Sequence, residues 1–277
     1  MQLELAQIPV TDGLSGPDSA NVQRVLHTIN QRAAGTDLIV FPETTLSGFP
    51  TRENIHTVAE PLDGPSLTAV RQAAREARVG VAVGLAERDG QRFFNTTVLI
   101  DDHGEIALRY RKTHLWASDV GVFEPGDRYE VCSFKGLTVG LLICYDIEFP
   151  ETARAVASLG ADLLIVTNGN MDPFGPVHRR AIVARAMENQ MFAALVNRIG
   201  SGDDNLTFPG ESALIDPLGD VVSDAGQQET VLRATLDPAR LEAAREHYRY
   251  LHDARIALDL ATEDSTDGQR IRVIRPR

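Results

Sequence analysis

The amino-acid sequence predicts a layered α/β sandwich, and three observations support this prediction. Short apolar runs alternate with amphipathic helical segments along the chain. Many expected strands accompany about four or five expected helices, which favours packed sheets over a barrel. The 277 residues are 43% hydrophobic and 24% charged, as in ordinary globular domains. Since no linker interrupts the pattern, we expect one domain over residues 1–261 and a polar C-terminal tail of low order over 262–277.

The first half of the chain is expected to form a βαβ unit, followed by another helix and a hairpin. In chain order the expected elements are a strand over 3–8, a helix over 19–33, a strand over 37–41, a helix over 66–78, and strands over 80–86, 94–101 and 105–110. The strands are short apolar runs, and the helices repeat apolar residues at the helical period. The sequence Asp102-His103-Gly104 between the last two strands is typical of a hairpin turn.

The second half repeats this theme with a longer helix. The expected elements are strands over 131–134 and 137–143, a helix over 150–159, a strand over 162–167, a helix over 177–190, and strands over 192–197, 212–216 and 231–236. A turn is expected over 216–220, where the sequence is Asp-Pro-Leu-Gly-Asp. The chain is expected to be helical again after Asp237.

The charge balance limits the partners of the protein. The 27 lysines and arginines are outnumbered by 39 aspartates and glutamates, so the formal net charge is −12. Because such a chain repels phosphate backbones and anionic lipids, neither nucleic acid nor a membrane is expected as a partner. No stretch approaches the roughly 20 apolar residues of a membrane helix, and the opening MQLELAQIPV lacks the basic region of a signal peptide. We expect a cytoplasmic protein that acts on a small molecule.

Cysteine and lysine are both rare in this chain. The two cysteines, Cys132 and Cys144, are too few for a disulfide scaffold or a four-thiolate metal site. No HExxH motif or paired Cys/His spacing occurs, so no metal and no other cofactor is expected. Lys112 and Lys135 are the only lysines, although arginine fills every other basic position apart from histidine. A lysine in such a chain suggests a specific task.

Cys144 stands at the end of an apolar strand, a few residues before the expected start of a helix at Pro150. A cysteine on such a tight turn has backbone N–H groups and a helix amino terminus nearby, which stabilise negative charge and suit a nucleophile. This segment alone also fits a buried structural cysteine, because free cysteines are usually small buried hydrophobes. Cys132, in the middle of an expected strand, is assigned to packing.

A thiol nucleophile needs a base, and the sequence offers histidine or glutamate. His114 and His178 lie in loop or helix-start positions and stay open as partners in a Cys–His arrangement. Glu43 follows the apolar strand over 37–41, where α/β proteins collect functional groups. Partial desolvation would raise the pKa of a carboxyl group there and suit it for general-base work. Lys112 ends another strand, and its ammonium group suits the stabilisation of an oxyanion.

Three segments together resemble the carbon-nitrogen hydrolase, or nitrilase, superfamily. The family pattern has an apolar strand followed by PE, a YRKxHL segment and a strand ending in CYDxxFPE; this chain reads FPETTLSGF, YRKTHLW and LLICYDIEFPE in the same order and with the same spacing. EPGD at 124–127, ADLLIVTNGN at 161–170 and RAMENQ at 185–190 extend the resemblance over about residues 3–253. It implies a four-layer αββα sandwich, a catalytic triad of Glu43, Lys112 and Cys144 with a thioester intermediate, and homodimers or larger homo-oligomers.

The resemblance also suggests further residues of the site. A second catalytic-site glutamate of the family falls on Asp119, which is a shorter carboxylate. Expected substrate contacts near the motifs are Tyr145, Glu148, Trp116, Asn168 and Phe174. Phe208 is a further candidate, and each aromatic side chain is also compatible with simple packing.

The substrate class follows from the residues after the cysteine. True nitrilases usually continue with Trp-Glu, whereas Tyr145-Asp146 here is more similar to the amidase and carbamoylase branches. Members that bind a substrate carboxylate often have arginine where this chain has Glu148. If Glu148 faces the cavity, it repels anionic substrates and favours neutral or cationic amides; a solvated position at the helix start is equally compatible with the sequence.

The resulting prediction is an enzyme that hydrolyses a small aliphatic amide to a carboxylic acid and ammonia. Three alternatives follow it in order: an N-carbamoyl amine amidohydrolase, a nitrilase, and a catalytically silent binding module. The last usually lacks a triad residue, and all three are present here.

Overall fold

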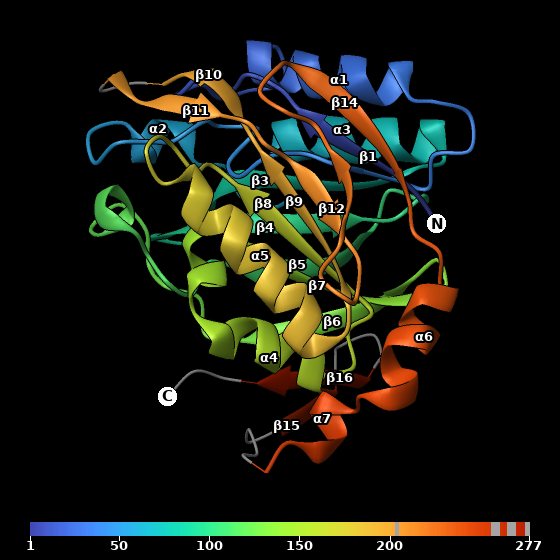
Figure 1. Ribbon diagram of the computed structural model, residues 1–277. Helices are drawn as coiled ribbons and strands as arrows, with labels where there is room; N and C mark the ends of the chain where they lie inside the picture. Colours follow the sequence, from blue (N-terminus) through green and yellow to red (C-terminus); the bar gives the residue numbers. More distant parts are fainter. Residues whose placement is uncertain (203–204, 256–260, 265–269, 275–277) are drawn as a thin grey trace.

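The computed structural model describes residues 1–202, 205–255, 261–264 and 270–274. Two large sheets form the centre of this part of the chain (Figure 1). The first sheet has the strand order β14-β1-β2-β3-β4-β5. Its strands are β1 (Gln2–Gln7), β2 (Leu38–Val40), β3 (Gly80–Asp89), β4 (Arg92–Ile100), β5 (Ile106–Arg111) and β14 (Thr230–Thr235).

The second sheet has the strand order β13-β12-β9-β8-β7-β6-β16-β15. Its strands are β6 (Tyr129–Phe134), β7 (Leu137–Ile143), β8 (Leu163–Asn168), β9 (Phe192–Asn197), β12 (Ala213–Ile215), β13 (Val221–Asp224), β15 (Ala261–Asp264) and β16 (Arg270–Ile274). Strands β7, β8 and β9 run parallel, so their carboxyl ends lie at the same edge of the sheet. A separate small hairpin joins β10 (Ile199–Ser201) to β11 (Thr207–Pro209).

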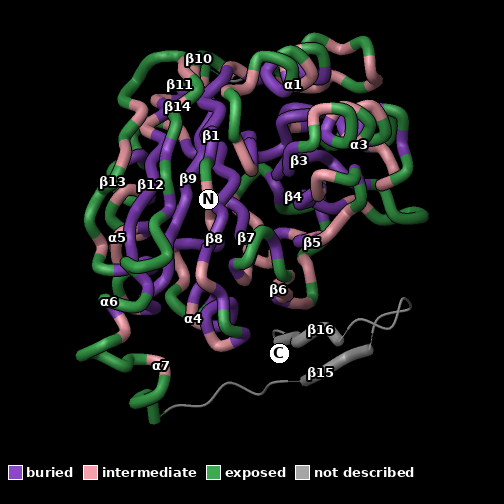
Figure 2. Tube along the Cα trace, turned by 90° about the vertical axis from the view of Figure 1, so that its right-hand side faces the viewer, coloured by how far each residue is buried: buried purple, intermediate pink, exposed green. Residues whose placement is uncertain are grey.

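Helices cover the outer face of each sheet. The longer helices are α1 (Ala20–Gln31) and α3 (Pro65–Ala77) on the first sheet, and α4 (Pro150–Ser158) and α5 (Gly175–Asn189) on the second. Shorter ones are α2 (Ile55–Val58), α6 (Ala239–His247) and α7 (Tyr250–Asp253), with 3₁₀ turns η1 (Ala117–Asp119) and η2 (Cys144–Glu148). The burial pattern in Figure 2 follows this order of layers, with buried strands inside and helices exposed on their outer sides. The predicted αββα sandwich is therefore confirmed.

The alternation of side chains along the strands explains the two halves of the core. Leu38 and Val40 of β2 point toward the second sheet and pack with Leu141 of β7. Ile39, between them, points the other way and packs with Val25 of α1 and with α3. Because both faces of β2 are buried, its sequence is continuously apolar, and polar groups appear only where the strand ends.

The segment expected to form the C-terminal tail contains two strands in the described structure. Within the segment that was predicted to be a polar tail of low order, β15 and β16 form a hairpin, and β16 pairs with β6 of the second sheet. Such pairing covers the backbone hydrogen-bonding groups at the edge of β6. Residues 265–269 and 275–277 of the tail lie outside the described residues. None of the described helices is both long and apolar enough to cross a membrane.

Candidate active site

Glu43 lies just beyond the end of β2, in a turn that depends on a close backbone approach. A Cβ atom at Gly84 of β3 would lie 2.3 Å from the backbone nitrogen of Thr44, so glycine is required there. The backbone N–H of Glu43 donates to the carbonyl of Asn168 at 3.3 Å, which ties the turn to the second sheet. These contacts place a fully buried carboxylate between the two sheets.

The carboxylate of Glu43 uses one of its oxygens for two hydrogen bonds. Oε1 accepts from the side-chain amide of Asn95 and from Nζ of Lys112, both at 2.8 Å. Oε2 is buried and has no hydrogen-bond partner. Burial raises the pKa of Glu43, the charge of Lys112 opposes that shift, and the charge of Asp119 adds to it. Glu43 thus keeps one oxygen available as a proton acceptor.

Lys112 follows β5 and connects the two carboxylates of the site. Its Nζ atom also donates to Oδ2 of Asp119 at 2.7 Å, and its side chain is only 2% exposed. Burial alone would lower the pKa of Lys112, but the negative charges of Asp119 and Glu43 raise it well above its usual value. The lysine is therefore a buried cation at neutral pH. Asp119 is held in η1 by the backbone N–H of Trp116 at 3.2 Å.

Cys144 is the first residue after β7 and begins η2. Its φ of +46° lies in the left-handed region, a strained conformation for a non-glycine residue that is typical of functional turns. Burial and the charge of Glu43 raise the pKa of the thiol well above its usual value, while Lys112 and a backbone hydrogen bond from Gly169 act in the opposite direction. The resting thiol is therefore protonated and needs a base before it can attack.

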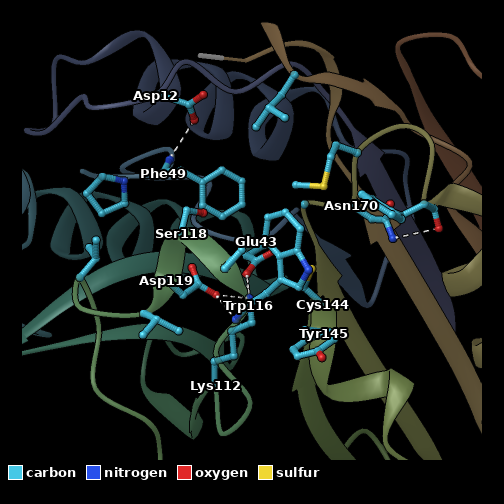
Figure 3. A pocket seen from close by; sticks show the side chains of 18 of the residues that line it. Asp12, Glu43, Phe49, Lys112, Trp116, Ser118, Asp119, Cys144, Tyr145 and Asn170 are labelled. Atoms are coloured by element: carbon cyan, nitrogen blue, oxygen red, sulfur yellow. Dashed lines mark hydrogen bonds and ion pairs between the residues drawn. The ribbon is translucent and has the colours of Figure 1, made fainter. Parts of the chain in front are cut away.

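Gly169, directly after β8, brings the thiol and the base together. Its backbone N–H donates to the sulfur of Cys144. A Cβ atom at this position would lie 2.9 Å from the free Oε2 of Glu43 and 2.5 Å from the ring of Phe49. Gly169 thus lies next to both the thiol and the carboxylate. Figure 3 shows the side chains of Glu43, Lys112, Asp119 and Cys144 close together in the cavity.

Asp146 fixes the turn that carries Cys144, a role that no pattern in the sequence predicts. The side chain is fully buried, and Oδ2 accepts from Tyr110 at 2.9 Å and from the backbone N–H of Ile143 at 3.1 Å. Oδ1 accepts from Thr113 and from the backbone N–H of His114, both at 2.9 Å. Asp146 thereby joins the end of β7 to the segment around Lys112. The CYD segment contained the residue, but three of its partners, Tyr110, Thr113 and His114, lie in or just after β5.

The two histidines that were candidate bases are bound to other groups. Nδ1 of His114 lies 3.0 Å from Oδ1 of Asp146, and its ring stacks on Phe149 at 4.0 Å. Nδ1 of His178 lies 3.0 Å from Oδ1 of Asn168, and its Nε2 lies 3.0 Å from Oε1 of Glu148. Burial and the charge of Lys112 lower the pKa of His178 to about 4. The charged groups that act on the thiol are Glu43, Lys112 and Asp119.

A cavity of about 630 Å³ opens over the thiol. Among the residues expected to contact substrate, Tyr145, Glu148, Trp116 and Phe174 line it. Glu148 therefore faces the cavity, which decides between the two interpretations left open by the sequence. Among the described residues, Asn168 does not line the cavity. Its side chain contacts His178, which does line it. Its neighbours Gly169 and Asn170 line the cavity instead, because β8 ends at Asn168.

Phe208 also lies outside the cavity wall in the described part of the chain. It is 1% exposed, stacks with Phe49 at 6.3 Å, and lies under the buried guanidinium of Arg198 at 4.1 Å. Its packing supports Phe49, which lines the cavity. Among the described residues, no group of three or more His, Cys, Asp or Glu side chains is placed to hold a metal ion.

Comparison with known proteins identifies the family. The family model described as carbon-nitrogen hydrolase matches residues 5–246. An (R)-stereoselective amidase from Pseudomonas sp. is 51% identical over 270 residues, which cover 98% of this chain and 97% of that relative. A 2-oxoglutaramate amidase from Bacillus subtilis is 31% identical over 87% of this chain and 93% of its own length.

Solved structures agree with this assignment. A CN-hydrolase superfamily protein from Xanthomonas campestris, which has an arsenic adduct in its active site, has a TM-score of 0.85 at 26% identity and covers 94% of this chain and 98% of its own. A variant of the amidase from Nesterenkonia sp. AN1 shows covalent addition of the acetamide moiety of fluoroacetamide at its active-site cysteine. Its TM-score is 0.78 at 25% identity, over 92% of this chain and 94% of its own. This chain belongs to the carbon-nitrogen hydrolase family.

Proposed function

We propose that the protein hydrolyses a primary carboxamide to a carboxylic acid and ammonia through a thioester on Cys144. The observation that carries this proposal is the buried arrangement of a protonated thiol, a carboxylate with one free oxygen, and an ammonium group. These are a nucleophile, a general base and an oxyanion stabiliser, which amide hydrolysis requires. The amidase names of the relatives, at 51% and 31% identity, support the same reaction.

The first half of the reaction forms the thioester. Oε2 of Glu43 takes the thiol proton as the sulfur of Cys144 attacks the amide carbon, and the carbonyl electrons move onto oxygen. Lys112 and the backbone N–H of Tyr145 stabilise this oxyanion; one such donor contributes about 3–4 kcal/mol in comparable sites. Glu43 then gives its proton to the leaving nitrogen, ammonia departs, and the carbonyl re-forms as a thioester.

The second half releases the acid. Glu43 takes a proton from a water molecule that attacks the thioester carbon, and Lys112 again stabilises the oxyanion. When this intermediate collapses, the carbon–sulfur bond breaks and the sulfur regains its proton from Glu43. The net change is the addition of one water to the amide. Asp119 does not contact the reacting atoms in this scheme; it holds Lys112 in place and keeps it charged.

The acyl group that fits this site is larger than that of acetamide. The cavity of about 630 Å³ lies within the range of sites that bind drug-sized ligands, roughly 300–1,000 Å³. Trp116 and Phe174 supply apolar surface, with ring centroids 6.4 Å apart. The expectation of a small aliphatic amide is thus extended to a bulkier one, and the name of the Pseudomonas relative supports testing both enantiomers of a chiral amide.

The test is ammonia release by purified protein from propionamide, a bulkier chiral amide, an N-carbamoyl amine and a nitrile. We expect ammonia from the amides with the wild-type protein and none with Cys144→Ala. Release of both ammonia and carbon dioxide from the carbamoyl compound would favour the carbamoylase alternative. If no compound reacts, or if Cys144→Ala keeps its activity, the proposal fails.

The proposal also covers the oligomeric state of the protein and its location in the cell. We place it in the cytoplasm, as a homodimer or larger homo-oligomer with one catalytic domain over residues 1–261. Met187 of α5 lies outside the cavity wall and is 47% exposed, and an exposed apolar side chain supports contact between copies. Light scattering of the purified protein measures the oligomer directly, and a monomeric mass would contradict it.

A further inference from the structure

The walls of the cavity have an excess of negative charge. Five carboxylates line it, from Asp12, Glu43, Glu53, Asp119 and Glu148, against two cations, from Arg52 and Lys112. The ammonium of Lys112 is shared between Glu43 and Asp119, and Asp12 is paired with Arg198 at 2.7 Å. The cations therefore do not compensate the remaining acidic groups, and the cavity disfavours an anionic ligand.

Glu148 is the acidic group that is best placed to meet a substrate. It ends η2, the same 3₁₀ turn that Cys144 begins, and it lines the cavity with a side chain that is 32% exposed. Oε1 of Glu148 lies 3.0 Å from Nε2 of His178. Burial and the charge of Lys112 lower the pKa of this imidazole to about 4, which favours its neutral form at pH 8. The partner of Glu148 on the protein side is thus an imidazole at 3.0 Å, and no lysine or arginine of the described residues pairs with this carboxylate.

The side-chain oxygen of Asn170 is a second hydrogen-bond acceptor, and no donor of the described structure reaches it. Its side chain is 3% exposed and belongs to the cavity wall, and its Oδ1 atom is buried without a hydrogen-bond partner. The amide nitrogen donates to the carbonyl of Phe174 at 3.4 Å, which orients the oxygen. Asn197 holds the backbone of Asn170 through two hydrogen bonds of 3.0 Å. A buried acceptor that is fixed and unpaired costs free energy until an N–H group reaches it.

Aromatic faces complete the surroundings. Trp116 and Phe174 line the cavity, and Tyr145 lines it beside Glu148 on η2. Rings of this kind attract a cation through the negative faces of their π systems, most strongly for tryptophan. A carboxylate without a lysine or arginine partner, an amide oxygen without a donor and aromatic side chains together match a protonated amine with apolar carbon around it.

We infer that the cavity binds amides whose acyl group carries a protonated amine, and that Glu148 and Asn170 are the residues that bind this amine. The inference rests on the proposed amide hydrolysis and names its substrate class. It requires that a cationic amide be preferred over a neutral amide of the same shape, and that an anionic amide be the poorest of the three.

Three amides of similar length test this preference at pH 8: 4-aminobutyramide as the cation, pentanamide as the neutral isostere and succinamate as the anion. At this pH the amine is still protonated. Burial raises the pKa of Glu148, so the comparison is made at a pH well above the ordinary pKa of a carboxyl group. We expect kcat/KM to be at least about tenfold higher for 4-aminobutyramide than for pentanamide, which corresponds to roughly 1.4 kcal/mol. Equal values for the two, or a preference for succinamate, would overturn the inference.

The variants Glu148→Gln and Asn170→Ala assign the preference to these residues. Each is expected to lower the ratio of kcat/KM for 4-aminobutyramide over pentanamide at least about fivefold, because each removes a partner of the ammonium group. Glu151→Gln is the matched control, since it makes the same change of charge at an exposed position on α4. It should leave the ratio as in wild type. A ratio that Glu148→Gln does not lower would contradict the assignment.

Binding without turnover separates this inference from the proposed reaction. Titration calorimetry of Cys144→Ala with 4-aminobutyramide should show binding that weakens in the double variant Cys144→Ala/Glu148→Gln. If Cys144→Ala binds 4-aminobutyramide in this way but the wild-type protein hydrolyses no amide, the proposed reaction is contradicted and the amine site is still supported. If the wild-type protein hydrolyses pentanamide and 4-aminobutyramide equally well, the proposed reaction is supported and the amine site is contradicted.

Discussion

Nζ of Lys112 lies 2.8 Å from Oε1 of Glu43, and this contact leaves the other carboxylate oxygen of Glu43 without a partner. The lysine therefore holds the base without occupying the oxygen that must accept a proton. Its second bond, to Asp119 at 2.7 Å, fixes it from the opposite side. A buried ammonium between two carboxylates stays charged, so it can stabilise an oxyanion at neutral pH.

The two lysines offer a matched comparison of this role. Lys112→Ala should lower kcat at least about a hundredfold, because it removes an oxyanion donor from a buried site. Lys135→Ala removes an ammonium that is paired with Asp102 on the surface, at 2.6 Å, and should keep kcat within about twofold of wild type. Steady-state kinetics of both variants measure this. Equal losses in the two would show that Lys112 has no special role.

The charge of Asp119 should be visible in the pH dependence of activity. The negative charge of Asp119 raises the pKa of Glu43, so Asp119→Asn should lower that pKa. The base form of Glu43 is the active one, and the acid limb of the kcat/KM profile should therefore move to lower pH in this variant. An acid limb that stays in place or moves upward would contradict the coupling. Because Glu43, Lys112 and Asp119 interact, the profile reports an apparent pKa of these coupled residues together.

Asp146 should act on catalysis through the position of Cys144. In Asp146→Asn, one carboxylate oxygen becomes an NH₂ group that cannot accept the hydrogen bonds Asp146 accepts. The change should lower the free energy of unfolding by about 1–3 kcal/mol. It should also lower kcat about tenfold or more, since small displacements of a nucleophile are costly. Denaturant unfolding and kinetics together measure both effects.

Asp216→Asn is the control for this change. Asp216 is also buried and accepts two backbone N–H groups at 2.9 Å, from Leu218 and Asp220, in a turn outside the cavity wall. Its replacement should reduce stability by a similar amount and leave kcat unchanged. If Asp146→Asn loses stability but keeps its kcat, Asp146 has a purely structural role.

Alkylation should distinguish the two cysteines. Burial raises the pKa of Cys132 to about 12, and Cys132 has no base beside it in the described structure, so iodoacetamide should label it slowly. Cys144 has Glu43 to remove its proton, and labelling there should inactivate the enzyme. Peptide mass spectrometry should find the label on Cys144 in wild type, and Glu43→Gln should slow inactivation. Preferential labelling of Cys132 would contradict this account.

The sequence alone identified the parts of the site that lie where strands end. Glu43 and Cys144 follow the apolar strands β2 and β7, and Lys112 follows β5; polar residues at strand ends are typical of sites in α/β proteins. The resemblance to the family then joined the three segments, and the structure brings the three side chains together with Asp119.

Other parts depend on contacts that no local pattern specifies. Asn95 lies in the middle of β4, and its bond to Glu43 depends on how β3 and β4 pair. Gly169 matters because a Cβ atom would meet Glu43 and Phe49, which are more than a hundred residues away in the chain. Asn168 was expected to contact substrate, but it is the last residue of β8, and its Oδ1 atom contacts Nδ1 of His178. The hairpin of β15 and β16 forms because the edge of β6 is available to it.

The central claim is that the sulfur of Cys144 forms a thioester with the acyl group of an amide. Rapid acid quenching during turnover, followed by mass spectrometry of the intact protein and its peptides, tests this most directly. We predict an adduct with the mass of the amide minus ammonia, located on the peptide that contains Cys144 and absent in Cys144→Ala. Ammonia release that continues in Cys144→Ala, or an adduct on another residue, would contradict the account.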